Sequence, residues 1–218
     1  MKEVIILGNG PTRVECPYHC ETWGVNGGYS FAKRLDKLFM TDSLEHEVLE
    51  EEYNVEKLIE FKGTLVLAKH FPVFDGLGLP IEIYPMDGIL SKFNTRFFSN
   101  TIAYMMAYAL YYDYKKIWFY GIDMMCNTSY IQEKGGVEFW MGVALGMGVE
   151  VINTLGSSTG KTWDGKMYGY WGLQEEEQLK EKLLAPWEII RTTRPEEEWA
   201  KVGQDWVKTP YGTTPEIG

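Results

Sequence analysis

The chain has 218 residues, of which 45% are hydrophobic and 15% aromatic, and this composition indicates a folded protein with one substantial core. Its formal net charge of −10 excludes a duplex DNA-binding protein, which needs a basic face, although a local pocket can still bind a small anion. The acidic charge therefore predicts no nucleic-acid partner. We expect no signal peptide, because the apolar run over residues 4–7 is too short, and no membrane span, because no apolar run reaches roughly 18 residues.

The three cysteines, Cys16, Cys20 and Cys126, form no disulfide framework, which predicts a reducing, cytoplasmic environment. His19 lies between Cys16 and Cys20, a spacing that invites a metal interpretation. A zinc site would need a second ligand pair at the usual spacing, and the sequence offers none. We therefore expect no metal and no other cofactor.

In chain order, residues 3–7 predict a buried first strand that ends in the turn Gly8-Asn9-Gly10-Pro11-Thr12. Glycines allow a ligand or another backbone to come close, and a glycine-rich turn after the first strand is a common nucleotide-binding position. The turn departs from the G-x-G-x-x-G pattern because Arg13 stands where the third glycine would be. A simple turn is an equally good interpretation.

Short strands alternate with helices along the rest of the first half. Strands are predicted over residues 22–26, 35–42, 64–68 and 81–84, and Asn26 closes the first of these. Residues 45–60 predict a helix with an acidic, solvated face, and residues 71–80 predict a loop rich in glycine and proline.

The stretch from residue 96 to residue 126 is central. Ser99, Asn100 and Thr101 are candidate N-caps before an apolar run, residues 102–112, which predicts a helix that is covered on nearly all sides. Residues 117–120 predict a buried strand, followed by Gly121-Ile122-Asp123. Ligands of open α/β sheets bind at the carboxyl ends of strands, and the free N–H groups of a helix start suit an anion. This stretch therefore predicts a cleft with a phosphate-binding rim and a nearby carboxylate.

The last part of the core is predicted as a polar loop over residues 127–136 that contains Tyr130, a helix over 137–147 and a strand over 149–153. Residues 156–162, GSSTGKT, resemble a P-loop but have three residues between the glycines where four are needed. We expect an α/β fold, a Rossmann-like and mostly parallel sheet with helices on both faces over residues 1–160. Residues 161–218 predict an appendage with an aromatic loop and an acidic helix over 174–184, which packs on the core or on a second copy in a homo-oligomer.

Four motifs together resemble the family 42 bacterial sialyltransferases. They are GNGPT after the first strand, an asparagine closing the second, F-N-x-R before a serine at a helix start, and the segment YGIDMMCNTSYIQ. The resemblance covers roughly residues 1–155 and implies a Rossmann-like domain that uses a CMP-sugar donor. Pterin pyrophosphokinase-like proteins share the GNGP start, and the chain also resembles a set of uncharacterised phage proteins.

The resemblance implies roles for single residues. Gly8, Asn9 and Gly10 would contact the nucleotide, and Asn26 would lie near the donor. Arg96 and Ser99 match an active-site arginine and a serine on the phosphate side, with Asn100 and Thr101 beside them at the helix start. Asp123, preceded by Gly121, matches an acid at the nucleotide edge, and Tyr130 matches a tyrosine near the leaving phosphate. Such a metal-free enzyme stabilises the leaving phosphate with hydroxyl, guanidinium and backbone donors.

The chain departs from the family in lacking a histidine after His70, where the family has its catalytic base; the other histidines are His19 and His46. Three functions stay open: a glycosyltransferase using a CMP-linked sugar, a protein that binds a nucleotide or a nucleotide signal without transfer, and a metal-dependent pyrophosphokinase-like enzyme using Asp42 and Asp123. Each of three site residues could instead have a purely structural role. Arg96 could form an ion pair with Asp87, Ser99 could cap the helix, and Asp123 could accept hydrogen bonds from a neighbouring turn.

Overall fold

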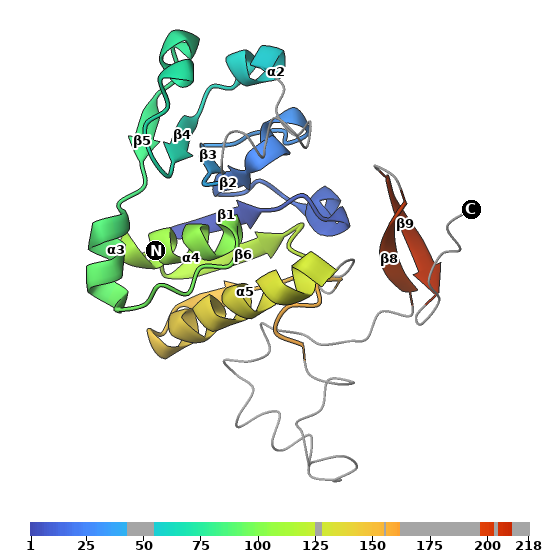
Figure 1. The fold of residues 1–218 in the computed structure, drawn as a ribbon. Coiled ribbons are helices and arrows are strands. Elements are labelled where there is room, and N and C mark those ends of the chain that lie inside the picture. Colours follow the sequence, from blue (N-terminus) through green and yellow to red (C-terminus); the bar gives the residue numbers. More distant parts are fainter. Residues whose placement is uncertain (43–54, 125–127, 155, 162–196, 203–204, 211–218) are drawn as a thin grey trace.

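The structure is a computed structural model, and it describes residues 1–42, 55–124, 128–154, 156–161, 197–202 and 205–210. Seven strands form one sheet in the order β5-β4-β3-β2-β1-β6-β7, and every neighbouring pair in it is parallel (Figure 1). The strands are β1 (Glu3–Leu7), β2 (Glu21–Val25), β3 (Lys37–Met40), β4 (Thr64–Leu67), β5 (Ile81–Ile83), β6 (Lys116–Tyr120) and β7 (Glu150–Ile152). This arrangement confirms the predicted Rossmann-like α/β fold.

The strand order reverses between β1 and β6. From β1 the chain builds outward through β2 to β5, then returns across the sheet by α3 (Met86–Phe93) and α4 (Thr101–Tyr111) to place β6 on the other side of β1. The crevice at such a reversal, outside the carboxyl ends of the strands, is where open α/β sheets bind ligands. The reversal here falls between β1 and β6, so the turns that follow these two strands mark the position of the candidate site.

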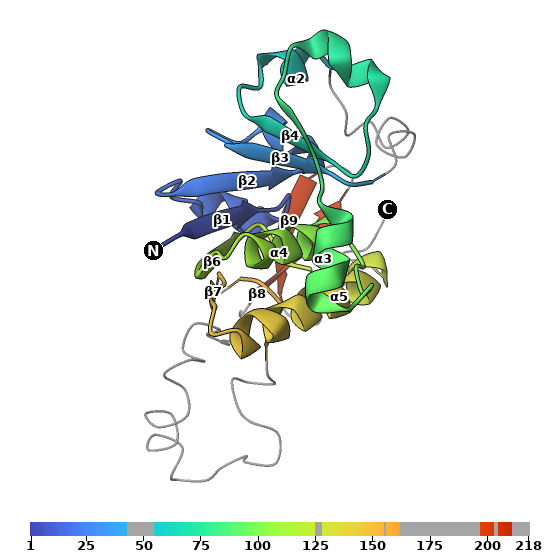
Figure 2. The ribbon, with the colours of Figure 1, turned by 90° about the vertical axis from the view of Figure 1, so that its left-hand side faces the viewer.

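The sheet is covered on both faces. Val4 and Ile6 of β1 face a core that contains α4 and α5 (Thr128–Gly146), whereas Ile5 and Leu7 face a second core that includes Leu58 of α2 (Val55–Glu60). Figure 2 shows α3, α4 and α5 gathered on one side of the strands. Because β1 is buried on both faces, it carries an uninterrupted apolar run, as central parallel strands do.

Helix α4 is the central helix that the sequence predicts. Nine of its residues are buried, from Thr101 to Leu110, and Asn100 caps it by accepting a hydrogen bond of 3.0 Å from the Ala103 amide. The cap is thus the second of the three candidates, and Ser99 has another role described below.

Helix α5 begins much earlier than predicted, because residues 128–136 are helical and not a loop. The glycines Gly135 and Gly136 suggested a loop. Gly136 nevertheless lies within the helix. A Cβ at this position would stand only 1.9 Å from the hydroxyl oxygen of Ser99. Close approach of α5 to the start of α4 therefore requires a glycine at this position.

The region beyond residue 160 is described only in part. Two strands that the sequence did not predict, β8 (Glu197–Val202) and β9 (Asp205–Pro210), form an antiparallel pair. The aromatic loop and the acidic helix predicted beyond residue 160 lie outside the described residues. Residues 45–54 of the acidic helix predicted over 45–60 also lie outside them. The division at residue 160 stays a prediction. None of the described helices combines the length and apolar character that a membrane crossing needs.

Candidate functional site

The turns that follow β1 and β6 pack directly on each other at the reversal of the sheet. The Gly8 amide donates a hydrogen bond of 2.8 Å to the Tyr120 oxygen, and the Gly10 amide donates one of 2.8 Å to the Gly121 oxygen. A Cβ on Gly8 would meet the Gly121 oxygen at 2.4 Å, and Gly121 has a φ of 68° that favours glycine. These glycines are therefore required by contact between the two turns, and a role in binding a nucleotide stays a prediction.

Asp123 is buried beneath this contact and is bound on both carboxylate oxygens. Thr12 donates from its amide at 2.9 Å and from its hydroxyl at 2.6 Å. Burial raises the pKa of Asp123, while the two Thr12 hydrogen bonds act to lower it. With 3% of its surface exposed, Asp123 positions the turn after β1 in this state.

The same Thr12 hydroxyl joins three elements. It accepts hydrogen bonds from the Gly121 amide at 2.8 Å and from the Thr154 hydroxyl at 3.1 Å. Ser157 lies in the segment that resembles a P-loop, and its hydroxyl donates a hydrogen bond of 2.6 Å to the backbone oxygen of Ile122. The Ser158 amide donates one of 2.9 Å to the backbone oxygen of Asp123. Ser157 and Ser158 thus hold the turn after β6 in place, and these hydrogen bonds are made to the protein itself.

A second group of polar side chains lies at the carboxyl ends of β2 and β3. Asn26 has a φ of 45°, a conformation that asparagine tolerates better than most residues. Its side-chain amide donates a hydrogen bond of 2.8 Å to the carboxylate of Asp42. Thr101, at the first turn of α4, makes a hydrogen bond of 2.9 Å with Thr41 and a longer one of 3.4 Å with Asp42. The structure thus brings together Asn26, Asp42 and the start of α4.

Two asparagine side-chain oxygens at this edge are buried without a hydrogen-bond partner. They are Oδ1 of Asn9, after β1, and Oδ1 of Asn26, after β2. A buried acceptor left unpaired costs roughly 1–3 kcal/mol, so native proteins keep few of them without a purpose. Both acceptors directly follow adjacent parallel strands, where a ligand that carries donors could pair them.

The start of α4 is joined to α5 through Glu133, a residue that sequence reasoning missed. The Ser99 hydroxyl donates a hydrogen bond of 2.6 Å to the backbone oxygen of Glu133, and the Asn100 side chain donates one of 3.4 Å to the Glu133 carboxylate. Burial raises the pKa of Glu133; the bond from Asn100 lowers it, and the charge of Asp42 raises it further. Glu133 escaped notice because residues 127–136 were predicted as loop.

The side chain of Arg96 is exposed on the segment between α3 and α4. Its neighbour Phe97 is held in place, since the Trp140 indole donates 2.9 Å to the Phe97 oxygen. Within the described part of the chain no ion pair joins Arg96 to Asp87, so the structural alternative for this arginine is not found. Tyr130 lies in the first turns of α5, and its side chain falls outside the described part of the chain.

Arg13 is a further cation at this edge. Its guanidinium donates a hydrogen bond to the backbone carbonyl oxygen of Asn9 and stacks over the Phe31 ring, 4.8 Å from the ring centre. Sequence reasoning noted Arg13 only as the residue that breaks the glycine pattern. An arginine directly after a glycine-rich turn was the available signal.

Comparisons with known proteins give no sequence relatives: no family model matches the chain, and neither does any curated protein. Solved structures of the Campylobacter jejuni sialyltransferase CstII are similar to it in part. One, in complex with the substrate analogue CMP-3FNeuAc, has a TM-score of 0.48 at 17% identity over 70% of this chain and 81% of that one. Another, in complex with cytidine-5'-monophosphate, has a TM-score of 0.46 at 20% identity over 70% and 79%. At this degree of likeness, function has to be argued from the side chains themselves.

Proposed function

We propose that the chain binds a nucleotide sugar, CMP-linked in its class, at the carboxyl edge of β1 and β2 and transfers the sugar without a metal. The observation that carries the proposal is the pair of unpaired buried oxygens on Asn9 and Asn26. Ribose hydroxyls and the amino group of a base are donors, and they would satisfy such acceptors. The CMP class comes from the motif resemblance around GNGPT and YGID.

The phosphate would lie against the start of α4, where the helix dipole and the backbone N–H groups that the Asn100 cap does not use favour an anion. Arg13, in the turn after β1, supplies positive charge. Arg96 lies on the segment that leads into α4, and its exposed guanidinium can pair bidentately with phosphate. Asp42 and Glu133 oppose an anion here. A ligand of high negative charge is therefore disfavoured relative to a phosphodiester such as a CMP-linked sugar.

In the transfer, the acceptor hydroxyl oxygen forms a bond to the anomeric carbon as the bond from that carbon to the phosphate oxygen breaks. The hydroxyl proton goes to a base, and CMP leaves with the electron pair. Glu133 of α5 is the carboxylate best suited to accept this proton, because it contacts Asn100 at the start of α4 and burial raises its pKa. Asp123 is unsuited, since Thr12 occupies both of its oxygens.

The second candidate function is binding without transfer, as in a protein that sequesters a nucleotide or a nucleotide-derived signal. The full engagement of Asp123 and the lack of a histidine beyond His70 favour it. A metal-dependent pyrophosphokinase-like reaction is less well supported, because Thr12 blocks Asp123 as a metal ligand.

The test is a thermal-shift screen of nucleotides and nucleotide sugars, followed by donor hydrolysis and transfer assays with the ligands that bind. A ligand that binds only the folded state raises the melting temperature. We expect CMP-linked sugars to give the largest shift and to be hydrolysed without added magnesium. Tight binding with no turnover from any donor would instead establish the binding function, and magnesium-dependent turnover would establish the third.

A further inference from the structure

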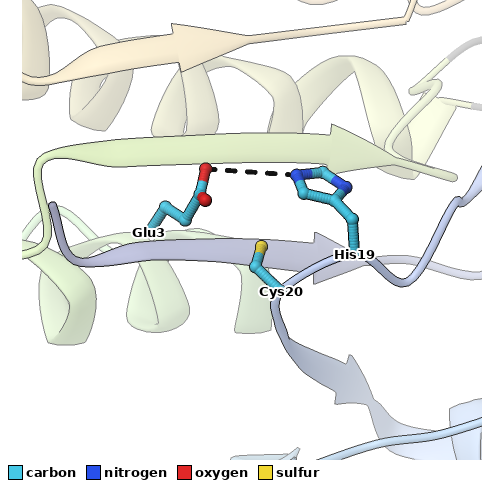
Figure 3. Close-up of side chains that lie close together, drawn as sticks. All are labelled: Glu3, His19 and Cys20. Atoms are coloured by element: carbon cyan, nitrogen blue, oxygen red, sulfur yellow. Dashed lines mark ion pairs between the residues drawn. The ribbon is translucent and has the colours of Figure 1, made fainter.

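We propose that Glu3, His19 and Cys20 bind one zinc ion at the amino edge of the sheet, on the side away from the candidate nucleotide site. One ligand atom from each residue lies within 4.8 Å of the other two, and within the described residues this is the one group of three possible metal ligands that gathers so closely. Figure 3 shows the Glu3 carboxylate and the His19 ring facing each other, with the Cys20 sulfur pointing toward the line between them.

The parallel pairing of β1 and β2 explains why the three residues meet. Val4 pairs with Glu21, so the residues one step earlier, Glu3 and Cys20, lie side by side where the two strands begin. His19 precedes Cys20 in the connection from the turn after β1. The sequence shows a Cys-x-x-x-Cys segment without a second ligand pair, and the sheet supplies the missing carboxylate from a distant part of the chain.

The distances suit a metal after a small movement. Glu3 Oε2 and His19 Nε2 are 4.0 Å apart. Zinc binds oxygen and nitrogen at roughly 2.0–2.2 Å and thiolate sulfur at roughly 2.3 Å, so tetrahedral ligand atoms stand about 3.3–3.7 Å from one another. A contraction of roughly 1 Å therefore closes the site. His19 and Glu3 have side chains that are 38% and 36% exposed, which leaves them free to rotate and gives an ion a path from solvent.

The chemistry of the ligand set selects zinc over magnesium or calcium. Thiolate and imidazole suit zinc, whereas the two harder cations prefer oxygen ligands throughout. One carboxylate and one thiolate balance the two charges of the ion, and the proton of the Cys20 thiol leaves to solvent when the sulfur binds. Three protein ligands leave the fourth tetrahedral position to a water molecule or to an exogenous group.

Trp118 of β6 supports two of the three ligands. Its indole N–H donates 3.0 Å to Oε2 of Glu3, and its ring contacts the His19 ring edge-on with centres 4.9 Å apart. Metal-binding carboxylates are ordinarily held by such an outer hydrogen bond. Two cations that contact Trp118 or Cys20 are already engaged. Lys116, over the Trp118 ring, pairs with Glu150 at 3.0 Å, and Arg34, bonded to the Cys20 backbone oxygen, pairs with Asp36 at 3.3 Å. A zinc ion here would join the amino-terminal ends of β1 and β2, with Trp118 of β6 supporting its ligands.

The site is separate from the proposed nucleotide site. Glu3 opens β1 and Leu7 closes it, which places the two edges about 13 Å apart at 3.3 Å per residue. Zinc binding should therefore raise the melting temperature without competing with a nucleotide.

The test measures zinc binding to the purified full chain by competition with a chromophoric chelator, beside the absorption of the cobalt-substituted protein. We expect one zinc per chain and a near-ultraviolet thiolate-to-cobalt band. Cys20→Ser should abolish the band, and Cys20→Ser, His19→Ala and Glu3→Gln should each lower zinc affinity by more than about 100-fold. Trp118→Phe, which removes only the supporting hydrogen bond, should lower it by about 10- to 100-fold.

The matched controls are His70→Ala, which removes a histidine paired with Asp75 at 2.8 Å, and Cys16→Ser, which removes the buried thiol. Both should bind zinc as the wild type does. Zinc affinity unchanged in all three ligand variants, or a loss in Cys16→Ser equal to that in Cys20→Ser, overturns the assignment. If a variant fails to fold, the wild-type cobalt spectrum decides, because a folded protein that binds no cobalt or shows no thiolate band lacks the site.

Discussion

The hydroxyl of Thr12 donates a hydrogen bond of 2.6 Å to a carboxylate oxygen of Asp123, 111 residues away in the chain, and both side chains are buried. This contact ties the turn after β1 to the turn after β6, at the reversal of the sheet. It explains why a threonine ends the GNGPT segment and an aspartate ends the GID segment. The two motifs that suggested a nucleotide site therefore bind to each other through buried hydrogen bonds.

Thr12→Val tests this contact between the two turns. Valine keeps the shape of threonine but removes the hydroxyl, which leaves the buried Asp123 carboxylate and the Gly121 amide each short of a partner. We expect the free energy of unfolding to fall by about 1–3 kcal/mol or more, measured by urea denaturation. Thr95→Val is the control, since the Thr95 hydroxyl accepts only an exposed hydrogen bond of 3.2 Å. Equal stability of the two variants would mean that the Thr12–Asp123 contact contributes nothing.

Gly136→Ala tests the close approach of α5 to Ser99. An alanine Cβ at this position would stand 1.9 Å from the Ser99 hydroxyl oxygen, so the helices must separate, at a cost of typically 1–3 kcal/mol. Gly142 lies in the same helix with nothing within 4 Å of an added Cβ. Gly142→Ala should therefore stabilise the protein by about 0.5–1 kcal/mol. The prediction fails if both alanines change the denaturation midpoint in the same direction.

Glu133→Gln separates transfer from simple binding. Removing the charge should strengthen binding of a CMP-linked sugar, because the carboxylate repels the phosphate at the start of α4. If Glu133 is the base, the same change should lower turnover by about 10²- to 10⁴-fold. Calorimetry and a transfer assay measure the two effects. A variant with weaker binding and wild-type turnover would exclude Glu133 from both roles.

The charge of Glu133 also predicts a pH dependence. Its pKa is raised above the ordinary 4.5, so the group is neutral below that value and becomes charged as the pH rises through the raised pKa. Wild-type affinity for a CMP-linked sugar should therefore decrease as the pH rises from 4.5 toward 7. Glu133→Gln should show a flat profile over the same range, and the same slope in both proteins would assign the effect to another group.

Arg96→Lys addresses the exposed arginine. A guanidinium pairs bidentately with phosphate, and lysine lacks this geometry. In a transferase the change should lower turnover more than nucleotide affinity, because the group acts on charge that develops in the transition state. In a binding protein only affinity should fall. Unchanged turnover and affinity would remove Arg96 from the site.

Local patterns predicted the fold well, because strands such as residues 3–7 and the apolar run of α4 carry their own signal. Contacts between distant segments could not be read in this way. Gly136 is a helix residue only because Ser99 lies against it, and Glu133 reaches the site only because α5 extends to Thr128. The pairing of Glu3 with Cys20 likewise depends on strand register.

The central claim is that a nucleotide pairs the unpaired oxygens at the carboxyl edge, and titration of Asn9→Ala with a CMP-linked sugar tests it most directly. Without ligand, Oδ1 of Asn9 has no hydrogen bond to lose and its burial is itself unfavourable, so the variant should be at least as stable as the wild type in urea denaturation. Its affinity should fall by about 2- to 10-fold, the value of one hydrogen bond. Ser91→Ala, an exposed change on α3, should leave both quantities unchanged. Wild-type affinity in Asn9→Ala, or a wild type that binds no nucleotide sugar, would contradict the account.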